Sequence, residues 1–357
     1  MSDMRERALL TGNEAIAEAA VKSGCRYFFG YPITPQNRIP EYMSKRLPEV
    51  DGVYLQAESE IAAINMVFGA AGAGVRVMTS SSSPGISLMQ EGISFIAAAE
   101  LPCLIVNMMR GGPGLGGIQP SQSDYFQATK GGGHGDYRLL VLAPSTVQES
   151  ADLTMLAFDL ADRYRSPIMI LGDAYTGQMM EPVQFKESES VNLPPKDWAI
   201  TGAEGRARNL IRTLFPEPEE LEQRNLQLNR KYEGMISNER RVEMYEVDDA
   251  EIIIAAFGFV ARIAKTSIEI LRGKGIKAGL IRPITLFPFP YGAFSNVADK
   301  VDKFLVVEMN MGQMVEDVKL GINGKAEVCF YGRTGGMVPS YEEIVREVKR
   351  IHRGGCC

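Results

Sequence analysis

The alternation of short apolar segments with longer amphipathic segments is the feature that most limits how this chain can fold. Runs such as Tyr27–Phe29 and Cys103–Met109 are typical of strands, and Thr146–Tyr164 is typical of a helix. The first helix is expected to begin at Asn13 as its N-cap. Strands that alternate with helices predict a parallel sheet covered on both faces, and the continuously apolar runs fit burial on both sides. We therefore expect a doubly wound α/β domain.

The alternation is interrupted once, which divides the chain into three parts. From Glu181 prolines and charges appear together with the single tryptophan, Trp198, and a highly charged helical stretch follows at 218–245. We interpret this part as a connecting arm between domains or onto a partner subunit, with a solvated helix as the alternative. A second α/β pattern begins at Glu251 and ends in a helix at 340–352. The predicted divisions are residues 1–190, 191–249 and 250–357.

Composition argues against several classes of protein. The chain has 357 residues, 45% of them apolar, which allows a large core, and its net charge of −6 argues against a nucleic-acid-binding surface. No apolar run reaches the ~20 residues of a membrane-spanning helix. The segment Met1–Arg7 is charged and lacks the apolar core of a signal peptide. We therefore expect a cytoplasmic protein that spans no membrane.

The five cysteines form no C-x-x-C pair, so the sequence predicts no zinc or iron–sulfur site on this chain. Scattered cysteines also suit a reducing cytoplasm. The terminal Cys356–Cys357 pair is either reactive or ligating, or belongs to a frayed end, and we favour the frayed end.

A rigid turn follows the first predicted strand. Gly30–Pro35 contains Pro32 and Pro35, which end the strand and stiffen the backbone. Ligands of open α/β sheets bind at the carboxyl ends of the strands, where this turn presents the Thr34 hydroxyl. The alternative is an ordinary strand-to-helix turn in which Thr34 caps the next helix.

Glu60 lies at the start of a helix of small and apolar residues, predicted over 57–74. Burial among such residues favours the protonated form of a carboxyl, which can donate a hydrogen bond to a ring nitrogen. Thiamine cofactors require a glutamate that does this at their aminopyrimidine ring. The alternative is a first-turn glutamate stabilised by the helix dipole, and Glu58 fits either role.

Arg110 ends an apolar strand and enters the glycine-rich loop Gly111–Gly117. An arginine at the carboxyl end of a strand is well placed to bind a carboxylate bidentately, and the glycines allow the backbone to approach a ligand closely. The loop matches neither G-x-G-x-x-G nor a P-loop. An ion pair at the sheet edge is the alternative.

Three further stretches are weaker candidates. Thr79–Ser83 is expected to be a polar turn before a helix, suited to an anion or to simple capping. His134 lies in the loop Gly131–Asp136 and is either a proton donor or a polar contact. Leu171–Asp173 is similar to the start of the magnesium-diphosphate motif of thiamine enzymes, but the asparagine pair of that motif is missing, so we reject it.

Together these stretches resemble one family. The chain closely resembles the alpha subunit of 2-oxoacid:ferredoxin oxidoreductases, most of all the 2-oxoisovalerate (branched-chain) enzymes, with the 2-oxoglutarate enzymes close behind. The stretches that carry the resemblance, in order along the chain, are 30–35, 56–60, 79–85, 110–117, 119–124, 131–136, 282–288, 308–314 and 332–336.

The resemblance implies a fold and a set of site residues. Residues 1–190 would form a pyrimidine-binding thiamine diphosphate domain, and residues 250–357 a smaller transketolase C-terminal-like domain. By motif match Glu60 would be the cofactor glutamate and catalytic residue, whereas Thr34 and Arg110 would bind the 2-oxo acid. The further cofactor-binding candidates are Pro32, Ile33, Ser82 and Ser83.

The resemblance also implies that this chain supplies only half of an active site. The diphosphate and Mg²⁺ are expected on a beta subunit, and iron–sulfur clusters on partners that include a gamma and a ferredoxin-like delta subunit. Coenzyme A is expected to bind largely outside this chain. The implied reaction converts 2-oxoisovalerate (3-methyl-2-oxobutanoate) to its acyl-CoA and CO2, with electrons passed to ferredoxin.

Two alternatives to this reaction stay open. The same chemistry on 2-oxoglutarate needs a second cationic anchor, which the loop Gly111–Gly117 does not contain, although Arg38 or another subunit is a possible source. A non-catalytic assembly subunit of the same fold is the second alternative, and the presence of Thr34, Glu60 and Arg110 together argues against it.

Overall fold

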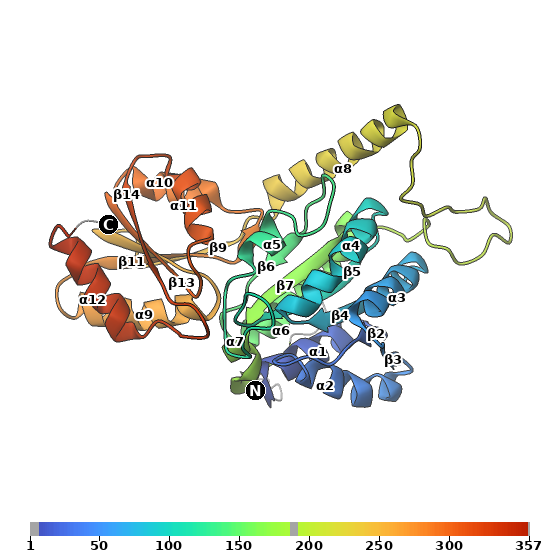
Figure 1. The fold of residues 1–357 in the computed structure, drawn as a ribbon, viewed down its shortest axis with the longest axis horizontal. Coiled ribbons are helices and arrows are strands. Elements are labelled where there is room, and N and C mark those ends of the chain that lie inside the picture. The colour runs from blue at the N-terminus through green and yellow to red at the C-terminus, as the bar shows by residue number, and fades with distance from the viewer. Residues whose placement is uncertain (1–6, 186–191, 356–357) are drawn as a thin grey trace, which may run out of the picture.

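The computed structural model describes residues 7–185 and 192–355 and contains two large sheets (Figure 1). The larger sheet has the strand order β12-β6-β7-β5-β4-β2-β3, and every neighbouring pair is parallel except β12 with β6. This confirms the predicted doubly wound α/β architecture. Its strands are β2 (Tyr27–Gly30), β3 (Val53–Gln56), β4 (Val77–Ser81), β5 (Cys103–Met109), β6 (Leu140–Leu142), β7 (Pro167–Asp173) and β12 (Thr285–Phe287).

Helices cover both faces of this sheet because its central strands β5 and β7 are mainly apolar on both sides. Along β5, Leu104 and Val106 pack into one core, whereas Cys103 and Ile105 pack into the other. The first core is covered by α1 (Gly12–Lys22), α2 (Arg38–Arg46) and α6 (Val147–Tyr164), and the second by α3 (Glu60–Gly72) and α4 (Ser83–Ala98). Shorter elements are η1 (Pro48–Val50), α5 (Tyr125–Thr129), α7 (Ala174–Gln178) and the antiparallel pair β1 (Ala8–Thr11) and β8 (Met180–Val183).

The smaller sheet has the order β14-β13-β10-β11-β9, and only its edge strand β9 is antiparallel. Helices α9 and α12 pack on one face, and α10 and α11 on the other. The elements are β9 (Val242–Tyr245), β10 (Ile252–Ala255), α9 (Gly258–Arg272), β11 (Ala278–Pro283), α10 (Tyr291–Ala298), β13 (Lys303–Glu308), α11 (Met314–Ile322), β14 (Glu327–Gly332) and α12 (Tyr341–His352).

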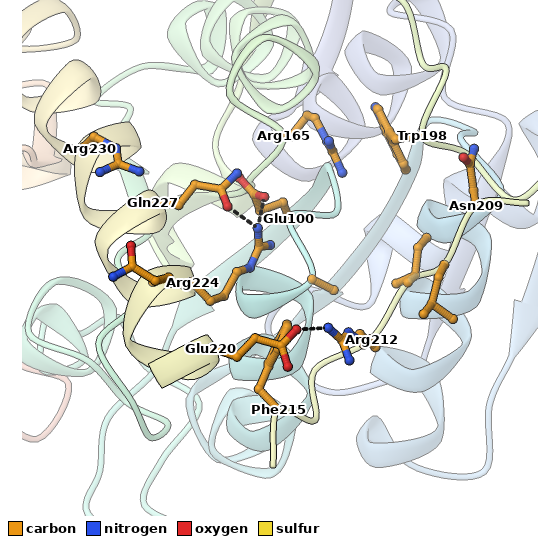
Figure 2. A pocket seen from close by; sticks show the side chains of 14 residues that line it. Glu100, Arg165, Trp198, Asn209, Arg212, Phe215, Glu220, Arg224, Gln227 and Arg230 are labelled. Atoms are coloured by element: carbon orange, nitrogen blue, oxygen red, sulfur yellow. Dashed lines mark hydrogen bonds and ion pairs between the residues drawn. The ribbon is translucent and has the colours of Figure 1, made fainter. Parts of the chain in front are cut away.

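The predicted connecting arm extends away from the first sheet and returns to it through helix α8 (Pro218–Asn238) (Figure 1). Leu228, Tyr232 and Met235 of α8 are buried against the same core as α3 and α4. The arm and α8 together line a pocket (Figure 2). The helix is therefore a packed element on the first sheet as well as part of the connection.

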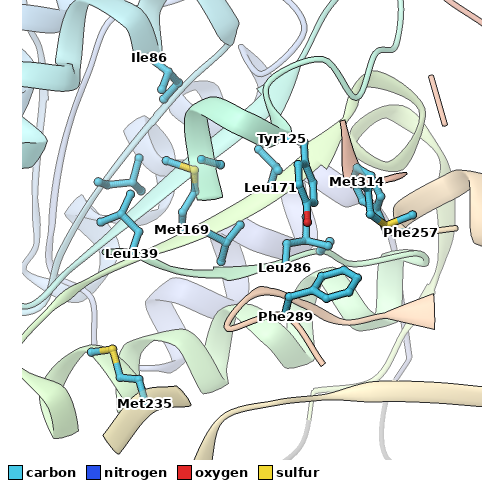
Figure 3. Close-up of a cluster of buried hydrophobic side chains, with 14 of the residues drawn as sticks. Ile86, Tyr125, Leu139, Met169, Leu171, Met235, Phe257, Leu286, Phe289 and Met314 are labelled. Carbon is cyan, nitrogen blue, oxygen red and sulfur yellow. The ribbon is translucent and has the colours of Figure 1, made fainter. Parts of the chain in front are cut away.

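One continuous core joins the two sheets (Figure 3). Leu171 of β7 and Met314 of α11 belong to the same buried cluster, and so do Tyr125 and Phe257, whose rings lie 5.7 Å apart. Strand β12, from the second half of the chain, pairs with β6 of the first sheet. The two predicted domains therefore share a core and a sheet. Their exact limits stay a prediction, and the predicted limit at residue 190 falls outside the described residues.

The structure corrects four local predictions. The N-cap of α1 is Thr11, which forms a capping box with Glu14, and Asn13 lies inside the helix. Helix α3 begins at Glu60, not at 57, because Ser59 caps it. Residues 79–81 belong to strand β4, so the polar turn is limited to Ser82 and Ser83.

The fourth correction concerns the stretch 218–245, which the sequence predicts to be helical throughout. Helix α8 ends at Asn238, and residues 242–245 form β9 instead. Glu239 is buried there and pairs with Arg241, and β9 then completes the edge of the second sheet.

Among the described residues, no helix combines the length and the apolar character needed to cross a bilayer. The predicted frayed end at Cys356–Cys357 lies outside the described residues.

A buried arginine connects the two sheets electrostatically. Arg282 of β11 donates to both oxygens of Glu149 on α6, at 2.7 and 2.6 Å, and its Nε lies 2.7 Å from Glu243 of β9. Burial alone would raise the pKa of Glu149, but the hydrogen bonds and charge of Arg282 hold it below the ordinary value. Glu149 therefore depends on this guanidinium for its only ion pair among the described residues, whereas Glu243 is also paired with Lys265.

We expect Arg282→Met to lower the unfolding free energy of the chain by about 3–5 kcal/mol, because Glu149 would lose the buried guanidinium that pairs with both of its oxygens. The matched control is Arg262→Met, which breaks a more exposed pair with Glu181 and should cost at most about 1 kcal/mol. Urea unfolding of both variants measures the difference. Equal stability of the two variants would contradict the role given to Arg282.

Candidate functional site

The candidate site lies where the strand order of the larger sheet changes direction. Strand β2 has β3 on one side and β4 on the other, so the chain leaves β2 toward one edge and returns across it to β4. In open α/β sheets, ligands bind in the crevice outside such a point, at the carboxyl ends of the strands. The turn after β2, the start of α3 and the start of α4 all meet at this edge.

Two buried side chains, Gln36 and Asn13, form hydrogen bonds with the backbone of the turn after β2. The side-chain amide of Gln36 donates to the Tyr31 carbonyl at 3.2 Å and accepts from the Ser80 hydroxyl at 2.6 Å. Asn13 donates to the Pro35 carbonyl at 3.0 Å. The predicted rigidity of the turn therefore comes from these contacts as well as from its prolines. Thr34 is half-buried within the turn.

Glu60 and Glu58 are clearly distinguished by burial. Glu58 is exposed, whereas Glu60 is 5% exposed and forms the first residue of α3. A methyl group built on Gly85 would lie 2.5 Å from Glu60 Oε1 and 2.0 Å from Ser81 Oγ. The Glu60 carboxyl therefore rests against the first turn of α4, and no described residue donates a hydrogen bond to it.

The end of β4 and the N-cap of α4 contain several buried hydroxyls. Thr79, Ser81 and Ser82 are fully buried, and their side-chain oxygens have no hydrogen-bond partner among the described residues. Ser82 occupies the N-cap position, but its hydroxyl does not cap the helix. Simple capping therefore does not account for this run. Unpaired polar atoms in a buried place are satisfied when a polar ligand binds.

Arg110 is 7% exposed and points across the edge toward the turn after β2. Its Nη1 donates to the Thr34 carbonyl at 3.0 Å, and its Nη2 donates to the Leu115 carbonyl at 3.2 Å. Its Nε is buried without a partner in the described chain. No carboxylate lies within 4 Å of the guanidinium in that part of the chain, so the alternative of an ion pair at the sheet edge is wrong.

Asp124 links the start of α4 to the end of β5. One of its oxygens accepts from the Ser83 hydroxyl at 2.6 Å and from the Asn107 amide at 2.9 Å. Burial raises the pKa of Asp124, and these two hydrogen bonds partly oppose that shift. Ser83 also accepts from the Arg110 backbone N–H at 3.1 Å, so the network fixes the start of the loop that follows Arg110.

A cavity of about 650 Å³ opens beside this network. No lysine, arginine or histidine is among the described residues that line it. The lining residues are Ser83, Pro84, Ser87, Gly112, Pro113, Gly114, Ser123, Asp124, Asn310, Met311, Gln313 and Thr334.

The structure brings most of the predicted residues together but leaves one apart. Thr34 and Arg110 are in contact, Glu60 lies against α4, and Ser82 and Ser83 begin that helix. His134 is exposed and packs on Phe95, near the other end of α4, about 18 Å from its start at 1.5 Å per residue. The structure therefore places the loop histidine at the far end of α4, away from the other candidate residues.

The structure also places three other positions that the sequence singled out. Pro32 is exposed and Ile33 half-buried, so both remain accessible to a ligand. Asp173 caps α7 by accepting from the backbone N–H groups of Tyr175 and Thr176, at 2.9 and 3.0 Å. No group of three or more candidate metal-binding side chains occurs in residues 7–185 and 192–355.

Sequence reasoning missed Asp124, Asn107 and Gly85 as site residues. Asp124 lies in one of the family-like stretches, which was the signal for it. Asn107 is a polar residue inside an apolar strand, and Gly85 is a glycine in the first turn of a helix. A polar residue in an apolar strand and a glycine in a helix both depart from the usual residue preferences of these elements, and both make a contact at the site.

The residues at this edge fit a polar, ring-containing cofactor such as thiamine diphosphate. An aminopyrimidine ring needs polar groups that are free to pair with it. The site offers the buried Glu60 carboxyl, which has no donor in the described chain, and the unpaired hydroxyls near it, and Gly85 has no side chain that would crowd them. Glu60 would hold the ring, with the turn after β2 and the start of α4 around it.

Comparisons with known families agree with this geometry. Residues 18–245 match the family described as pyruvate flavodoxin/ferredoxin oxidoreductase, thiamine diphosphate-binding. Residues 250–344 match pyruvate:ferredoxin oxidoreductase core domain II.

The chain is also similar over almost its whole length to proteins named as subunits of 2-oxo acid oxidoreductases. It is 50% identical to the ketoisovalerate oxidoreductase subunit VorB of Methanothermobacter marburgensis, over 96% of this chain and 97% of that protein. It is 36% identical to the 2-oxoglutarate synthase subunit KorA of Methanothermobacter thermautotrophicus, over 98% of this chain and 100% of that one.

Among solved structures, the chain resembles a 2-oxoglutarate:ferredoxin oxidoreductase from Magnetococcus marinus, solved with 2-oxoglutarate, coenzyme A and succinyl-CoA bound. The TM-score is 0.87 at 26% identity, covering 97% of this chain and 65% of the longer chain of that enzyme. A split-gene transketolase in an inactive β4 tetramer has a similar fold, with a TM-score of 0.59 at 12% identity.

We expect Gly85→Ala to lower the unfolding free energy by about 1–3 kcal/mol, because the added methyl overlaps Ser81 and Glu60. Gly69→Ala is the matched control: it is a helical glycine with open space around it, and it should stabilise the chain by about 0.5–1 kcal/mol. Urea unfolding measures both. A destabilisation of the same size in Gly69→Ala would rule out steric overlap as the cause.

Proposed function

Because the chain belongs to the family of 2-oxoacid:ferredoxin oxidoreductases, we propose that it is the alpha subunit that provides half of a thiamine diphosphate active site. The proposed reaction is the oxidative decarboxylation of 2-oxoisovalerate to its acyl-CoA and CO2, with electrons passed to ferredoxin. The buried Glu60 carboxyl, placed against α4 with no donor from the described chain, is the observation that carries the proposal.

Thiamine diphosphate, when bound, would supply the nucleophilic carbon and the electron sink that decarboxylation of a 2-oxo acid requires. The proposed role of Glu60 is to donate a hydrogen bond to the aminopyrimidine ring. The position of this carboxyl suits the role, since it is buried beside the start of α4 and no described residue pairs with it. Gly85 leaves the room that this contact needs.

Arg110 and Thr34 are the proposed binding residues for the 2-oxo acid. The guanidinium is already positioned by two backbone carbonyls and retains an unpaired Nε–H. A substrate carboxylate would bind there with charge-assisted hydrogen bonds, and the Thr34 hydroxyl would contact the same substrate. Because Arg110 also holds the Thr34 carbonyl, the two residues would position the substrate together.

A partner subunit is proposed to complete the site. Several apolar side chains around this edge are exposed, namely Leu115 (83%), Ile118 (53%), Met311 (81%) and Met337 (55%). Apolar groups gathered on one face commonly mark a protein–protein interface. The similar proteins are themselves named as subunits. We assign the diphosphate and Mg²⁺ to a beta subunit and iron–sulfur clusters to partners that include gamma and delta subunits.

The branched-chain substrate is favoured over 2-oxoglutarate by two observations. The similarity to the ketoisovalerate oxidoreductase subunit is greater than the similarity to the 2-oxoglutarate synthase subunit. The cavity beside Arg110 has no cation among its described lining residues, and Arg38 is paired with Glu14 at 3.4 Å. A second carboxylate would therefore find no free anchor in these places.

The experiment that tests the proposal is co-expression with the partner subunits and an oxygen-free assay of coenzyme-A-dependent viologen reduction across a panel of 2-oxo acids. Preference for 2-oxoisovalerate supports both reaction and substrate. Preference for 2-oxoglutarate keeps the reaction and overturns the substrate. No turnover by an intact, thiamine-loaded complex favours a non-catalytic subunit.

Cytoplasmic localisation stays a prediction.

We expect Glu60→Gln to lower kcat at least about 100-fold in the assembled complex, since the amide cannot supply the carboxyl proton. The variant should unfold at the same urea concentration as the wild type. Glu58→Gln is the matched control, because it makes the same change two residues away on an exposed side chain. Near-normal turnover in Glu60→Gln would refute its catalytic role.

We expect Arg110→Ala to raise the KM for the 2-oxo acid about ten- to a hundredfold, which corresponds to the loss of a charged hydrogen bond. Arg38→Ala provides the control, because this exposed arginine pairs with Glu14 instead. Steady-state kinetics of both complexes give KM and kcat separately. If KM and kcat were unchanged in Arg110→Ala, Arg110 would have no part in substrate binding.

A further inference from the structure

A second pocket, of about 620 Å³, lies at the opposite edge of the larger sheet (Figure 2). Glu100 precedes β5 and Arg165 precedes β7, so the pocket is at the amino ends of these strands. Arg224 and Arg230 of α8 form one side, and the arm that carries Trp198 forms the other (Figure 2). The proposed catalytic edge uses none of these residues.

Positive charge in this pocket exceeds negative charge. Glu100 is the shared partner of Arg224 at 2.5 Å and Lys231 at 3.2 Å. Arg165 and Arg230 have no carboxylate within 4 Å in the described chain, and Arg165 instead stacks on Trp198, 4.5 Å from the ring centroid. Burial lowers the pKa of Lys231 to about 8, and the charges of Arg224 and Arg165 add to that shift although Glu100 opposes it. The lining itself holds four arginines and two glutamates, and the second glutamate, Glu220, pairs with Arg212, so Arg165 and Arg230 are the arginines without a paired carboxylate among the described residues.

Unpaired donors point to the same conclusion. The Nε–H groups of Arg165 and Arg224 are buried and have no hydrogen-bond partner among the described residues. Native proteins rarely leave buried donors unpaired, and a bound ion or ligand commonly accepts from such groups. Both arginines line the pocket.

The backbone of the pocket is also unusual. Glu100 and Arg165 have φ angles of 54° and 46°, a region that favours glycine. They are two of the five non-glycine residues with positive φ in the part of the chain that the structure describes. Glycine would form either turn with less strain. The presence of a long charged side chain at both positions therefore indicates that the pocket requires these two side chains.

We propose that this pocket binds a small phosphate-bearing anion. Guanidinium groups match phosphate oxygens in geometry and charge, and Arg165 and Arg230 are the two arginines free to do so. The volume suits a small molecule better than a folded partner. This inference is independent of the proposed function, because it concerns other residues at the other edge of the sheet.

The test is isothermal titration of sodium pyrophosphate into the full chain and into the assembled complex. Arg165→Gln and Arg230→Gln should each weaken binding at least about tenfold, since each removes a charged hydrogen-bond donor. Arg230 is exposed on α8 and has no described partner, so its variant should fold normally. Arg240→Gln is the matched control, an exposed arginine just beyond α8 and outside the pocket, and it should bind as the wild type does.

Tenfold losses in both pocket variants and wild-type binding in Arg240→Gln support the proposal. Absence of binding at millimolar pyrophosphate, or unchanged binding in Arg165→Gln and Arg230→Gln, overturns it. Binding to the isolated chain that disappears in the complex also overturns it, because a partner subunit would then occupy the pocket.

Discussion

The fully buried side chain of Gln122 is the contact on which the arrangement of the two sheets depends. Its amide donates to the Phe257 carbonyl at 2.9 Å and accepts from the Met309 N–H at 3.0 Å, so both ends of the amide are paired with the second sheet. The Gln122 carbonyl accepts from Asn310 at 2.8 Å. Losing this side chain would leave buried backbone groups unpaired, which costs more than the loss of one ordinary hydrogen bond.

This contact also determines the shape of the candidate site. Asp124 follows Gln122 by two residues, and its carboxyl reaches Ser83 and Asn107 on the first sheet. Gln313 at the start of α11 donates to the Ser123 carbonyl at 2.7 Å, which fixes the same segment from the second sheet. The cavity between them is therefore formed by the docking of the two sheets. Neither sheet alone would place these groups around one space.

The sequence allowed prediction of the features that depend on local pattern. Continuous apolar runs predicted the central strands correctly, and the family resemblance, rather than local pattern, implied that Thr34 and Arg110 belong to one site, where the structure shows them in contact. Patterns could not show that Thr79–Ser81 continue a strand, because buried polar residues in a strand look like a turn. They also could not separate Thr11 from Asn13 as the cap, since both residues suit that position.

The remaining errors concern contacts between distant parts of the chain. The sequence pattern did not predict β12, whose partner β6 lies more than a hundred residues earlier. His134 was a weaker candidate than Arg110, and local pattern could not show that one lies near the end of α4 and the other near its start. Local chemistry predicts what a residue can do, whereas the fold determines which ligand it can reach.

Helix α4 and strand β5 both run from the candidate site to the anion pocket. Helix α4 has Gly85 against Glu60 at its start, and Ala98, just before Glu100, accepts a hydrogen bond from Arg224 at its end. Strand β5 likewise runs from the pocket edge to Arg110, a length of about 23 Å at 3.3 Å per residue. A ligand in the pocket would thus be too far away to contact the substrate. Any effect of it on turnover would have to pass through the packing of α4 and β5, which are buried and close-packed along their length.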